Sequence, residues 1–208
     1  VKVSIRRDYL RSAFAYGTPL IPHVVLMTSL AMIDRILLSH ISGLEEAGIY
    51  SSAFQVSMVM FLVITSFNQA FIPWLYPRLQ KLESDPTGAK RIVRVIYVFI
   101  AFLVSASLIL GLVAEPFVRV YLSEEFAAAG PLVPYLLFGA AAHGLFVIFS
   151  NFQYFYGRTS TLSGITCIAA GISIGLNVLL IPDHGAMGAV WANLIAYGCA
   201  FLLSATDI

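Results

Sequence analysis

The sequence predicts an all-α, polytopic membrane protein: a bundle of six transmembrane helices. Composition is the first reason, because 59% of the residues are apolar, only 11% are charged and the mean hydropathy is +0.87. Soluble domains carry charge on roughly a quarter of their residues, so this chain is expected to be solvated by lipid. The second reason is a series of long uncharged stretches, and the third is the sorting of basic residues between them.

Six stretches lack Asp, Glu, Lys and Arg: 12–33, 47–77, 95–114, 126–157, 159–182 and 184–206. A helix needs about 20 residues to cross about 30 Å of hydrocarbon, so each stretch is long enough for one span. Strands of an outer-membrane barrel would alternate over about 10 residues, and no such alternation is present. Helices are therefore favoured over a β-barrel.

The first two spans are predicted over Ala13–Ser39 and Ala47–Trp74, joined by a short outer turn, His40–Glu46. Pro19 lies near the start of the first span, where proline would kink or restart a helix. The second span is expected to end near Pro73 and Pro77. A loop over Leu79–Arg91, with a turn signal at Ser84–Gly88, should then return the chain.

The remaining spans are predicted over Ile92–Ala114, Pro131–Phe152, Thr161–Leu180 and Ala186–Ser204. Between the third and fourth, Glu115–Gly130 forms the longest outer connection and has room for a short interfacial helix. Because the loops are short, neighbouring spans should be antiparallel and adjacent, which predicts one compact lobe over residues 1–208.

Ten of the twelve basic residues lie before the first span or in alternate connections. Loops on the cytoplasmic side of membrane proteins carry the excess of Lys and Arg, so we expect a multi-pass protein of the plasma (inner) membrane with both termini cytoplasmic. The segment Lys2–Arg11 is also expected to attract anionic membrane lipids. The ten residues are Lys2, Arg6, Arg7, Arg11, Arg78, Lys81, Lys90, Arg91, Arg94 and Arg158.

Other classes of function find little support. The net charge is +1 and the charges are sorted by side, so no nucleic-acid partner is expected. Cys167 and Cys199 fall within spans, where they are expected to pack as small residues. The sequence has no metal-ligand cluster, nucleophile motif or Gly-rich phosphate loop, so we expect neither a cofactor nor an enzyme.

Asp34 and Arg35 are the exceptional pair, because charged residues inside a span are costly. Counting from Gly17, Asp34 lies roughly 26 Å along the helix, in the outer leaflet. Residues three or four positions away offer no opposite charge, so the partners must come from other spans. Two interpretations stay open. Arg35 reaches outer phosphates while Asp34 makes a structural bond, or Arg35 binds a phosphate on a water-filled path with Asp34 as a positioning or proton-coupling carboxylate.

Weaker polar candidates lie in later spans. Asn68 and Gln69 in the second span are candidate substrate contacts beside Arg35. His143 in the fourth span can titrate, so it joins Asp34 as a candidate for ion coupling. Asn177 and Asn193, in the fifth and sixth spans, could line a cavity or bond to a neighbouring helix.

Several motifs follow one another along the chain in a fixed order. They are Gly17–Leu20, Ile33–Arg35, Gly48–Ser51, Ala70–Pro73, Asn177–Pro182 and Gly185–Ala189. In order and spacing they resemble the C-terminal half of bacterial O-antigen-type polysaccharide flippases. That family belongs to the superfamily of multidrug, oligosaccharidyl-lipid and polysaccharide exporters.

The resemblance implies one six-helix lobe of a twelve-helix transporter. Such a transporter would move a polyprenyl-diphosphate-linked oligosaccharide to the outer leaflet by alternating access, for the synthesis of cell-surface polysaccharide. Arg35 would be a cation of the cavity, and an N-terminal six-span lobe would be missing. Two alternatives stay open: half of a cation-coupled multidrug efflux transporter, and a membrane glycosyltransferase or polymerase acting on polyprenyl-linked sugars.

Overall fold

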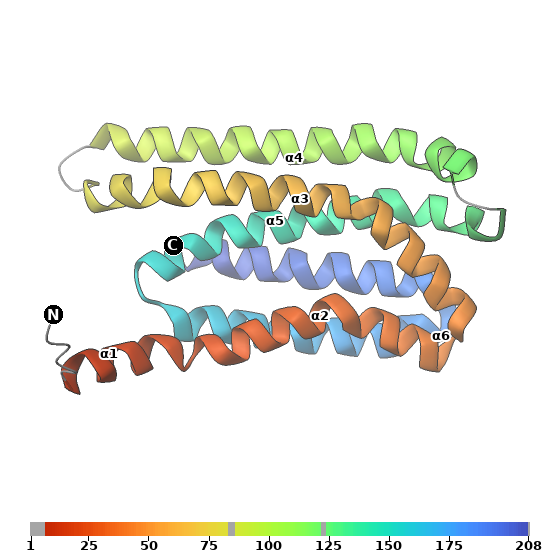
Figure 1. Ribbon diagram of the computed structural model, residues 1–208, viewed down its shortest axis with the longest axis horizontal. Helices are drawn as coiled ribbons and strands as arrows, with labels where there is room; N and C mark the ends of the chain where they lie inside the picture. The colour runs from red at the N-terminus through yellow and green to blue at the C-terminus, as the bar shows by residue number, and fades with distance from the viewer. Residues whose placement is uncertain (1–6, 83–85, 122–123, 208) are drawn as a thin grey trace, which may run out of the picture.

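The computed structural model describes residues 7–82, 86–121 and 124–207, and nearly all of them are helical. This confirms the all-α prediction over the described part of the chain. The helices follow one another without any intervening domain (Figure 1). In chain order they are α1 (Arg7–Gly17), α2 (Leu20–Ile41), α3 (Leu44–Gln80), α4 (Pro86–Tyr121), the 3₁₀ helix η1 (Glu124–Leu132), α5 (Val133–Phe155) and α6 (Thr159–Thr206).

Within the described residues, five helical stretches are long and apolar enough to cross a membrane. The last is α6, whose 48 residues are interrupted at Gly185, with φ 54° and ψ −134°. Arg158 at its start contacts Asp207 at its end, so α6 is a hairpin of two antiparallel halves. The interruption lies between the predicted fifth and sixth spans, whereas six separate crossings stay a prediction.

Proline separates two helices at Pro19 but lies inside α3, α4 and α6. The prediction that Pro19 restarts the first span is confirmed, because α1 ends at Gly17 and α2 begins at Leu20. The helix that carries the predicted second span does not end near Pro73, since α3 continues through Pro73 and Pro77 to Gln80. Where the span itself ends stays a prediction. A long helix keeps its remaining backbone groups paired, and proline removes only one donor, so continuing the helix costs less in lipid than opening it.

The connections are shorter than predicted for the same reason. The turn predicted over His40–Glu46 narrows to two residues, ending at Gly43 with φ 96°. Much of Leu79–Arg91 is helical, and Glu115–Tyr121 continues α4 instead of forming a loop. The short helix expected in that outer connection is present as η1. Of the predicted turn and basic segment, Ser84, Asp85, Lys2 and Arg6 lie outside the described residues.

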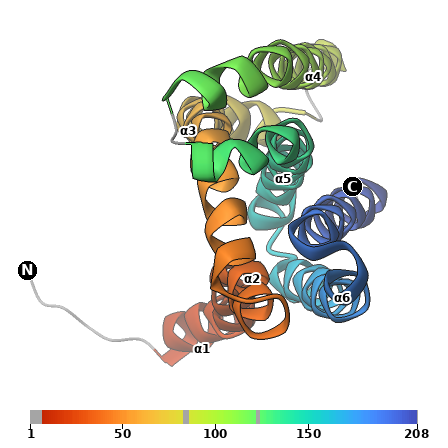
Figure 2. The same ribbon diagram turned by 90° about the vertical axis from the view of Figure 1, so that its right-hand side faces the viewer.

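The helices pack around α5. Viewed along the bundle, α2 lies against α6 on one side and α4 lies on the opposite side, while α3 crosses from α2 to α4 (Figure 2). The start of α1, the α3–α4 connection, the α5–α6 turn and the C-terminus gather at one end (Figure 1). We call this end, which carries the basic residues, the basic end. Its assignment to the cytoplasm stays a prediction.

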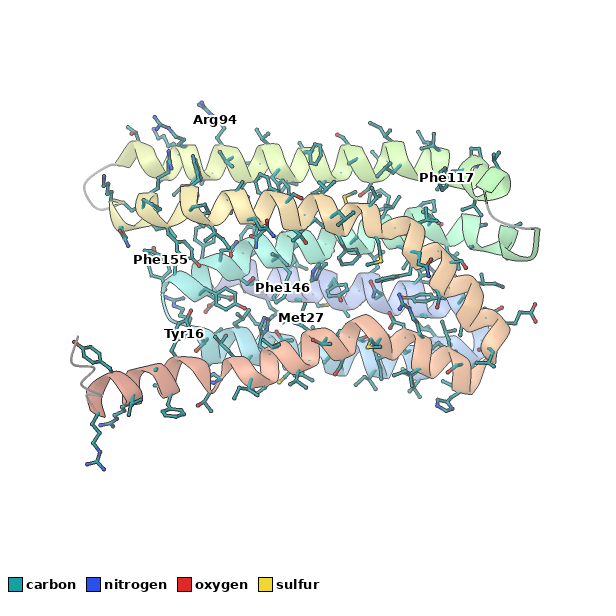
Figure 3. The ribbon with its side chains drawn as sticks, in the orientation of Figure 1. Tyr16, Met27, Arg94, Phe117, Phe146 and Phe155 are labelled. Carbon is teal, nitrogen blue, oxygen red and sulfur yellow. The ribbon has the colours of Figure 1, made fainter. Side chains whose placement is uncertain are left out.

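Two apolar clusters hold these contacts. The larger joins α3, α4 and α5, and includes Ile64 and Leu103, which close around Gly144. A smaller cluster around Phe146 joins α5 to α6, and Met27 of α2 packs against it (Figure 3). Large apolar side chains such as Leu112, 81% exposed, cover the outside of the bundle. An outward-facing apolar surface suits a protein surrounded by lipid.

Candidate functional site

A polar cluster lies in the interior of the bundle, far from the basic end. Asp34 is only 2% exposed, and three side-chain donors from other segments point at its carboxylate. Tyr50 Oη donates to Asp34 Oδ2 over 2.6 Å, Asn193 Nδ2 donates to the same oxygen over 3.0 Å, and Asn177 Nδ2 donates to Oδ1 over 2.8 Å. We call Asp34, Tyr50, Asn177 and Asn193 the Asp34 cluster.

Helical periodicity brings these four side chains together. Asp34 shares the buried face of α2 with Leu30 and Leu38, which precede and follow it by one turn. Asn177 comes from the first half of α6 and Asn193 from the second half, so the hairpin at Gly185 returns the second amide to the same carboxylate. Tyr50 comes from the start of α3. One carboxylate therefore ties together α2, α3 and both halves of α6.

The donors are suited to an ionised carboxylate, which accepts hydrogen bonds and donates none. Asn177 Nδ2 also donates to the Ser173 carbonyl oxygen over 2.8 Å, which fixes the direction of its amide. The expectation that Asp34 finds its partners on other spans is confirmed. Asn177 and Asn193, singled out from the sequence as weaker candidates, are two of those partners.

Arg35 takes a different environment from its neighbour in sequence. Its guanidinium carbon lies 4.4 Å from the centre of the Phe54 ring, an arrangement typical of a cation–π contact. Its Nε atom is buried and has no hydrogen-bond partner among the described residues. Arg35 is also close enough to Asp34 for a favourable Coulomb interaction. The Asp34 carboxylate thus has its hydrogen-bond partners, whereas the Arg35 guanidinium lacks one for its Nε atom.

A strip of rings continues from Arg35 into the bundle. The centre of the Phe54 ring lies 5.7 Å from that of Phe61, and the centre of the Phe61 ring lies 5.3 Å from that of His143. The centre of the His143 ring lies 4.8 Å from that of Tyr197. His143 Nδ1 is buried without a hydrogen-bond partner among the described residues. We call Phe54, Phe61, His143 and Tyr197 the aromatic strip.

The strip returns to the Asp34 cluster. Tyr197 follows Asn193 by one helical turn, so the two side chains lie on the same face of α6. His143, the second candidate for ion coupling, therefore connects to the cluster through Tyr197. The sequence analysis did not single out Tyr197 or the two phenylalanines. Their spacing along α3 and α6 is that of ordinary core residues, and only the position of Arg35 distinguishes them.

The other two predicted substrate contacts lie elsewhere. Asn68 is 18 residues after Tyr50, which corresponds to about 27 Å along α3. Its Oδ1 atom accepts a hydrogen bond from Asn151 Nδ2 over 2.7 Å, which joins α3 to α5. Gln69 is exposed on α3. The structure does not bring Asn68 and Gln69 together with Arg35.

Glu46 closes the far end of the cluster and was missed from the sequence. Its Oε2 atom accepts a hydrogen bond from the Ala186 backbone N–H over 2.8 Å, at the first residue after the interruption of α6. A carboxylate at a helix start pairs a free N–H and favours the helix dipole. A Cβ atom at Gly185 would stand 2.8 Å from Glu46 Oε2, so this approach favours glycine. Only the hairpin brings these residues together.

Within the described residues, no three His, Cys, Asp or Glu side chains stand close enough to hold a metal ion. Cys167 is exposed and Cys199 partly buried, and both are free. The Asp34 cluster contributes one carboxylate and two amides, and its carboxylate oxygens are already occupied by donors. The site therefore places one buried negative charge, on Asp34, next to one partly buried positive charge, on Arg35. The aromatic strip leads from Arg35 back to the Asp34 cluster.

Comparisons with known proteins give one matching family and membrane proteins among the relatives. Residues 1–131 match the profile of a family described as "Polysaccharide biosynthesis protein". An uncharacterised membrane protein of Haemophilus influenzae is 21% identical over 172 residues, covering 79% of this chain and 42% of its own length. An uncharacterised membrane protein of Methanocaldococcus jannaschii is 23% identical over 201 residues, covering 94% of this chain and 39% of its own length. The chain thus spans less than half the length of these relatives. No solved structure matches it.

Proposed function

Because this chain belongs to the polysaccharide biosynthesis protein family, we propose that it forms one lobe of a polysaccharide flippase. The cargo is a polyprenyl-diphosphate-linked oligosaccharide, and the whole transporter moves it across the plasma membrane by alternating access. A second six-helix lobe completes the path. The lobe lies in the inner membrane with its basic end, and both termini, on the cytoplasmic side, as the Lys and Arg distribution favours.

Arg35 is the observation that most supports this cargo. A guanidinium binds phosphate through a planar fork of N–H donors and stays charged in an apolar setting. The buried Nε of Arg35 lacks a hydrogen-bond partner within the described part of the chain, and the Phe54 ring lies against the guanidinium on one side. In our proposal the diphosphate approaches the remaining N–H groups as the head group passes between the two lobes. The lipid tail stays in the bilayer.

Asp34 supplies the ion-responsive element of the proposed mechanism. Protonation or binding of a small cation would remove acceptor sites from Tyr50, Asn177 and Asn193, and so loosen α2 from α6. The charge of Arg35 would then be less compensated and more available to the cargo phosphate. His143 responds to the same event through Tyr197. Transport proceeds without covalent chemistry, so we propose that the protein is not an enzyme.

The aromatic strip also favours a second candidate, cation-coupled multidrug efflux. Rings such as Phe61 and Tyr197 beside a buried carboxylate are what an organic cation would contact. Arg35 stands on that strip and would repel a cationic drug, which is why we rank this function second. A glycosyltransferase or polymerase finds no comparable support, because the Asp34 cluster presents no group to a sugar acceptor.

A reconstituted flipping assay tests the proposal. The intact protein is placed in vesicles, and outward movement of a lipid-linked oligosaccharide is followed by its exposure to an added sugar-binding or sugar-cleaving protein. We expect Arg35→Ala to lower the rate at least about tenfold, the scale of one charge-assisted phosphate contact, and Arg35→Lys to restore part of it. Arg91→Ala, at an exposed cation near the basic end, is the matched control.

Each result of that assay has a defined consequence. Flipping by Arg35→Ala at the parent rate would remove Arg35 from the mechanism. No flipping by the parent protein, together with Arg35-independent extrusion of an organic cation, would replace the proposed function with drug efflux.

A further inference from the structure

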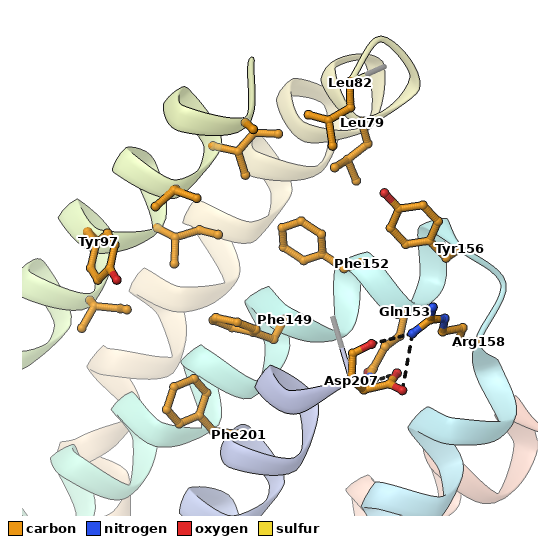
Figure 4. A pocket seen from close by; sticks show the side chains of 15 residues that line it. Leu79, Leu82, Tyr97, Phe149, Phe152, Gln153, Tyr156, Arg158, Phe201 and Asp207 are labelled. Atoms are coloured by element: carbon orange, nitrogen blue, oxygen red, sulfur yellow. Dashed lines mark hydrogen bonds and ion pairs between the residues drawn. The ribbon is translucent and has the colours of Figure 1, made fainter. Parts of the chain in front are cut away.

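A cavity of about 640 Å³ lies at the basic end, between the end of α3, the start of α4 and the ends of α5 and α6 (Figure 4). Its volume falls in the range of about 300–1,000 Å³ that is typical of ligand pockets. Most of its lining is aliphatic or aromatic, and its charged and amide side chains, Gln153, Arg158 and Asp207, stand together at one place. We call it the α4 groove; the residues that matter here are Ile96, Ile100, Phe152, Gln153, Arg158 and Asp207.

The α4 groove has the depth of one membrane leaflet. The lining residues of α4 run from Ala89 to Ile100 and recur at helical spacing, so they form one face of the helix. Eleven residues rise roughly 16 Å, about half of the 30 Å of hydrocarbon in a bilayer. The groove begins at the basic end and stops near mid-membrane. An apolar groove of this length matches the length of a single lipid chain in one leaflet.

Polar groups mark the mouth of the groove. Arg158 Nη1 lies 3.5 Å from Asp207 Oδ1, and the Arg158 side chain is 52% exposed. Gln153 Nε2 donates to Asp207 Oδ2 over 3.3 Å, which leaves its Oε1 atom as the free end of the amide. That oxygen is buried and has no partner among the described residues. The mouth therefore offers the exposed part of a guanidinium whose Nη1 is paired with Asp207, and an acceptor for a hydroxyl group.

The groove is separate from the Asp34 cluster. Leu79, which lines it, is 29 residues from Tyr50, about 44 Å along α3. Lys90 is exposed and follows Ala89 of the lining face in sequence. Arg94 projects away from the bundle (Figure 3). Cationic side chains at the membrane surface attract anionic lipids, each contributing about 1 kcal/mol. Position, depth and charge all favour a lipid of the leaflet at the basic end.

We propose that the α4 groove holds one chain of an anionic glycerophospholipid as a resident ligand, with the lipid phosphate beside Arg158 and a head-group hydroxyl donating to Gln153. The lipid fills the space between α4 and the rest of the bundle. This inference requires the helices to lie in a bilayer, and it does not depend on flipping. The lipid-linked oligosaccharide is the competing occupant, and the test below distinguishes it from the glycerophospholipid.

Native mass spectrometry of the intact protein tests this assignment. The protein is released from detergent with phosphatidylglycerol or phosphatidylcholine, and bound lipid is counted as a function of added lipid. We expect one phosphatidylglycerol per chain that survives release. Ile96→Trp, which fills the groove, should abolish this species, and Arg158→Gln should weaken it about fivefold, with Arg158→Lys close to the parent.

Matched controls separate the site from general lipid binding. Leu112→Trp adds the same ring to α4 at an exposed position outside the groove. Arg91→Gln removes an exposed cation of α4 that does not line the groove. Both should leave the one-lipid species unchanged. Equal retention of the two lipids, equal loss in the controls, or displacement of phosphatidylglycerol by the lipid-linked oligosaccharide would each overturn the proposal. A protein that flips normally without the bound lipid would overturn neither inference, because the two have separate readouts.

Discussion

The two sides of the bundle are held together by different forces. Where α2 meets α6, buried polar groups bond directly: Asp34 with Asn177 and Asn193, and His23 Nδ1 with Thr166 Oγ1 over 2.6 Å. Where α3 meets α4, rings stack instead, as in the Phe67–Phe99 pair with centres 3.7 Å apart.

This difference teaches how a fold is specified in lipid. Burying apolar surface yields little there, because lipid tails are as apolar as the side chains, so polar bonds and close packing decide which helices stay together. The polar side closes around Asp34. On the stacked side, the half of α4 at the basic end stands off from the bundle, and the α4 groove is the result.

The largest expected effect comes from breaking the polar side at its centre. Asp34→Asn replaces two acceptor oxygens by one, and its new N–H₂ group faces donors of Tyr50 and Asn193 or of Asn177. We expect the free energy of unfolding to fall by about 3 kcal/mol, as when one partner of a buried charged network is removed. Unfolding in mixed SDS micelles followed by circular dichroism measures it. Asp183→Asn, at an exposed aspartate, should change nothing.

A smaller effect is expected from the hairpin that brings Asn193 back to Asp34. A Cβ atom at Gly188 would stand 2.5 Å from the Leu180 carbonyl oxygen, and backbone cannot move away as a side chain can. We expect Gly188→Ala to cost about 2 kcal/mol of unfolding free energy. Gly175→Ala, in the same helix with no atom within 4 Å, is the control and should be neutral or slightly stabilising. Equal behaviour of the two variants would refute the close approach.

The smallest effect is expected at a single polar pair outside the Asp34 cluster. Asn68 and Asn151 form a side-chain pair between α3 and α5. Either single change to Leu leaves one amide unpaired and should cost about 1 kcal/mol, while the double change should cost less than the sum. A coupling energy near 0.6 kcal/mol is the expectation for such pairs in membranes. Strict additivity in the double-mutant cycle would show that the bond contributes nothing.

The sequence predicted the helical class and singled out Asp34 as a residue with partners on other spans, because charge in a span is rare enough to stand out. It also indicated the break near Pro19 and the one between Leu180 and Ala186. The ends of α3 and α4 were not predictable from proline, since the cost of one lost hydrogen bond competes with the cost of opening a helix in lipid.

The spacing of residues in the sequence did not predict which distant side chains become partners. Asn177 and Asn193 were visible as polar residues, but nothing in their spacing indicates that the hairpin at Gly185 aims both at one carboxylate. Tyr197 and Phe54 recur at the spacing of ordinary core residues, and Glu46 falls in the segment predicted as a turn. The distance between Asn68 and Arg35 depends on the length of α3, and the helix predicted from the sequence was too short.

The most direct test of the account is whether the Asp34 cluster does more than hold the helices. Flipping of a lipid-linked oligosaccharide by the intact protein is compared for the parent, Asp34→Asn and Gly188→Ala, at a temperature where circular dichroism shows all three to be folded. We predict that Asp34→Asn moves no more cargo than protein-free vesicles, whereas Gly188→Ala, also destabilised but with its carboxylate intact, still flips. Transport by Asp34→Asn at the parent rate would contradict the account.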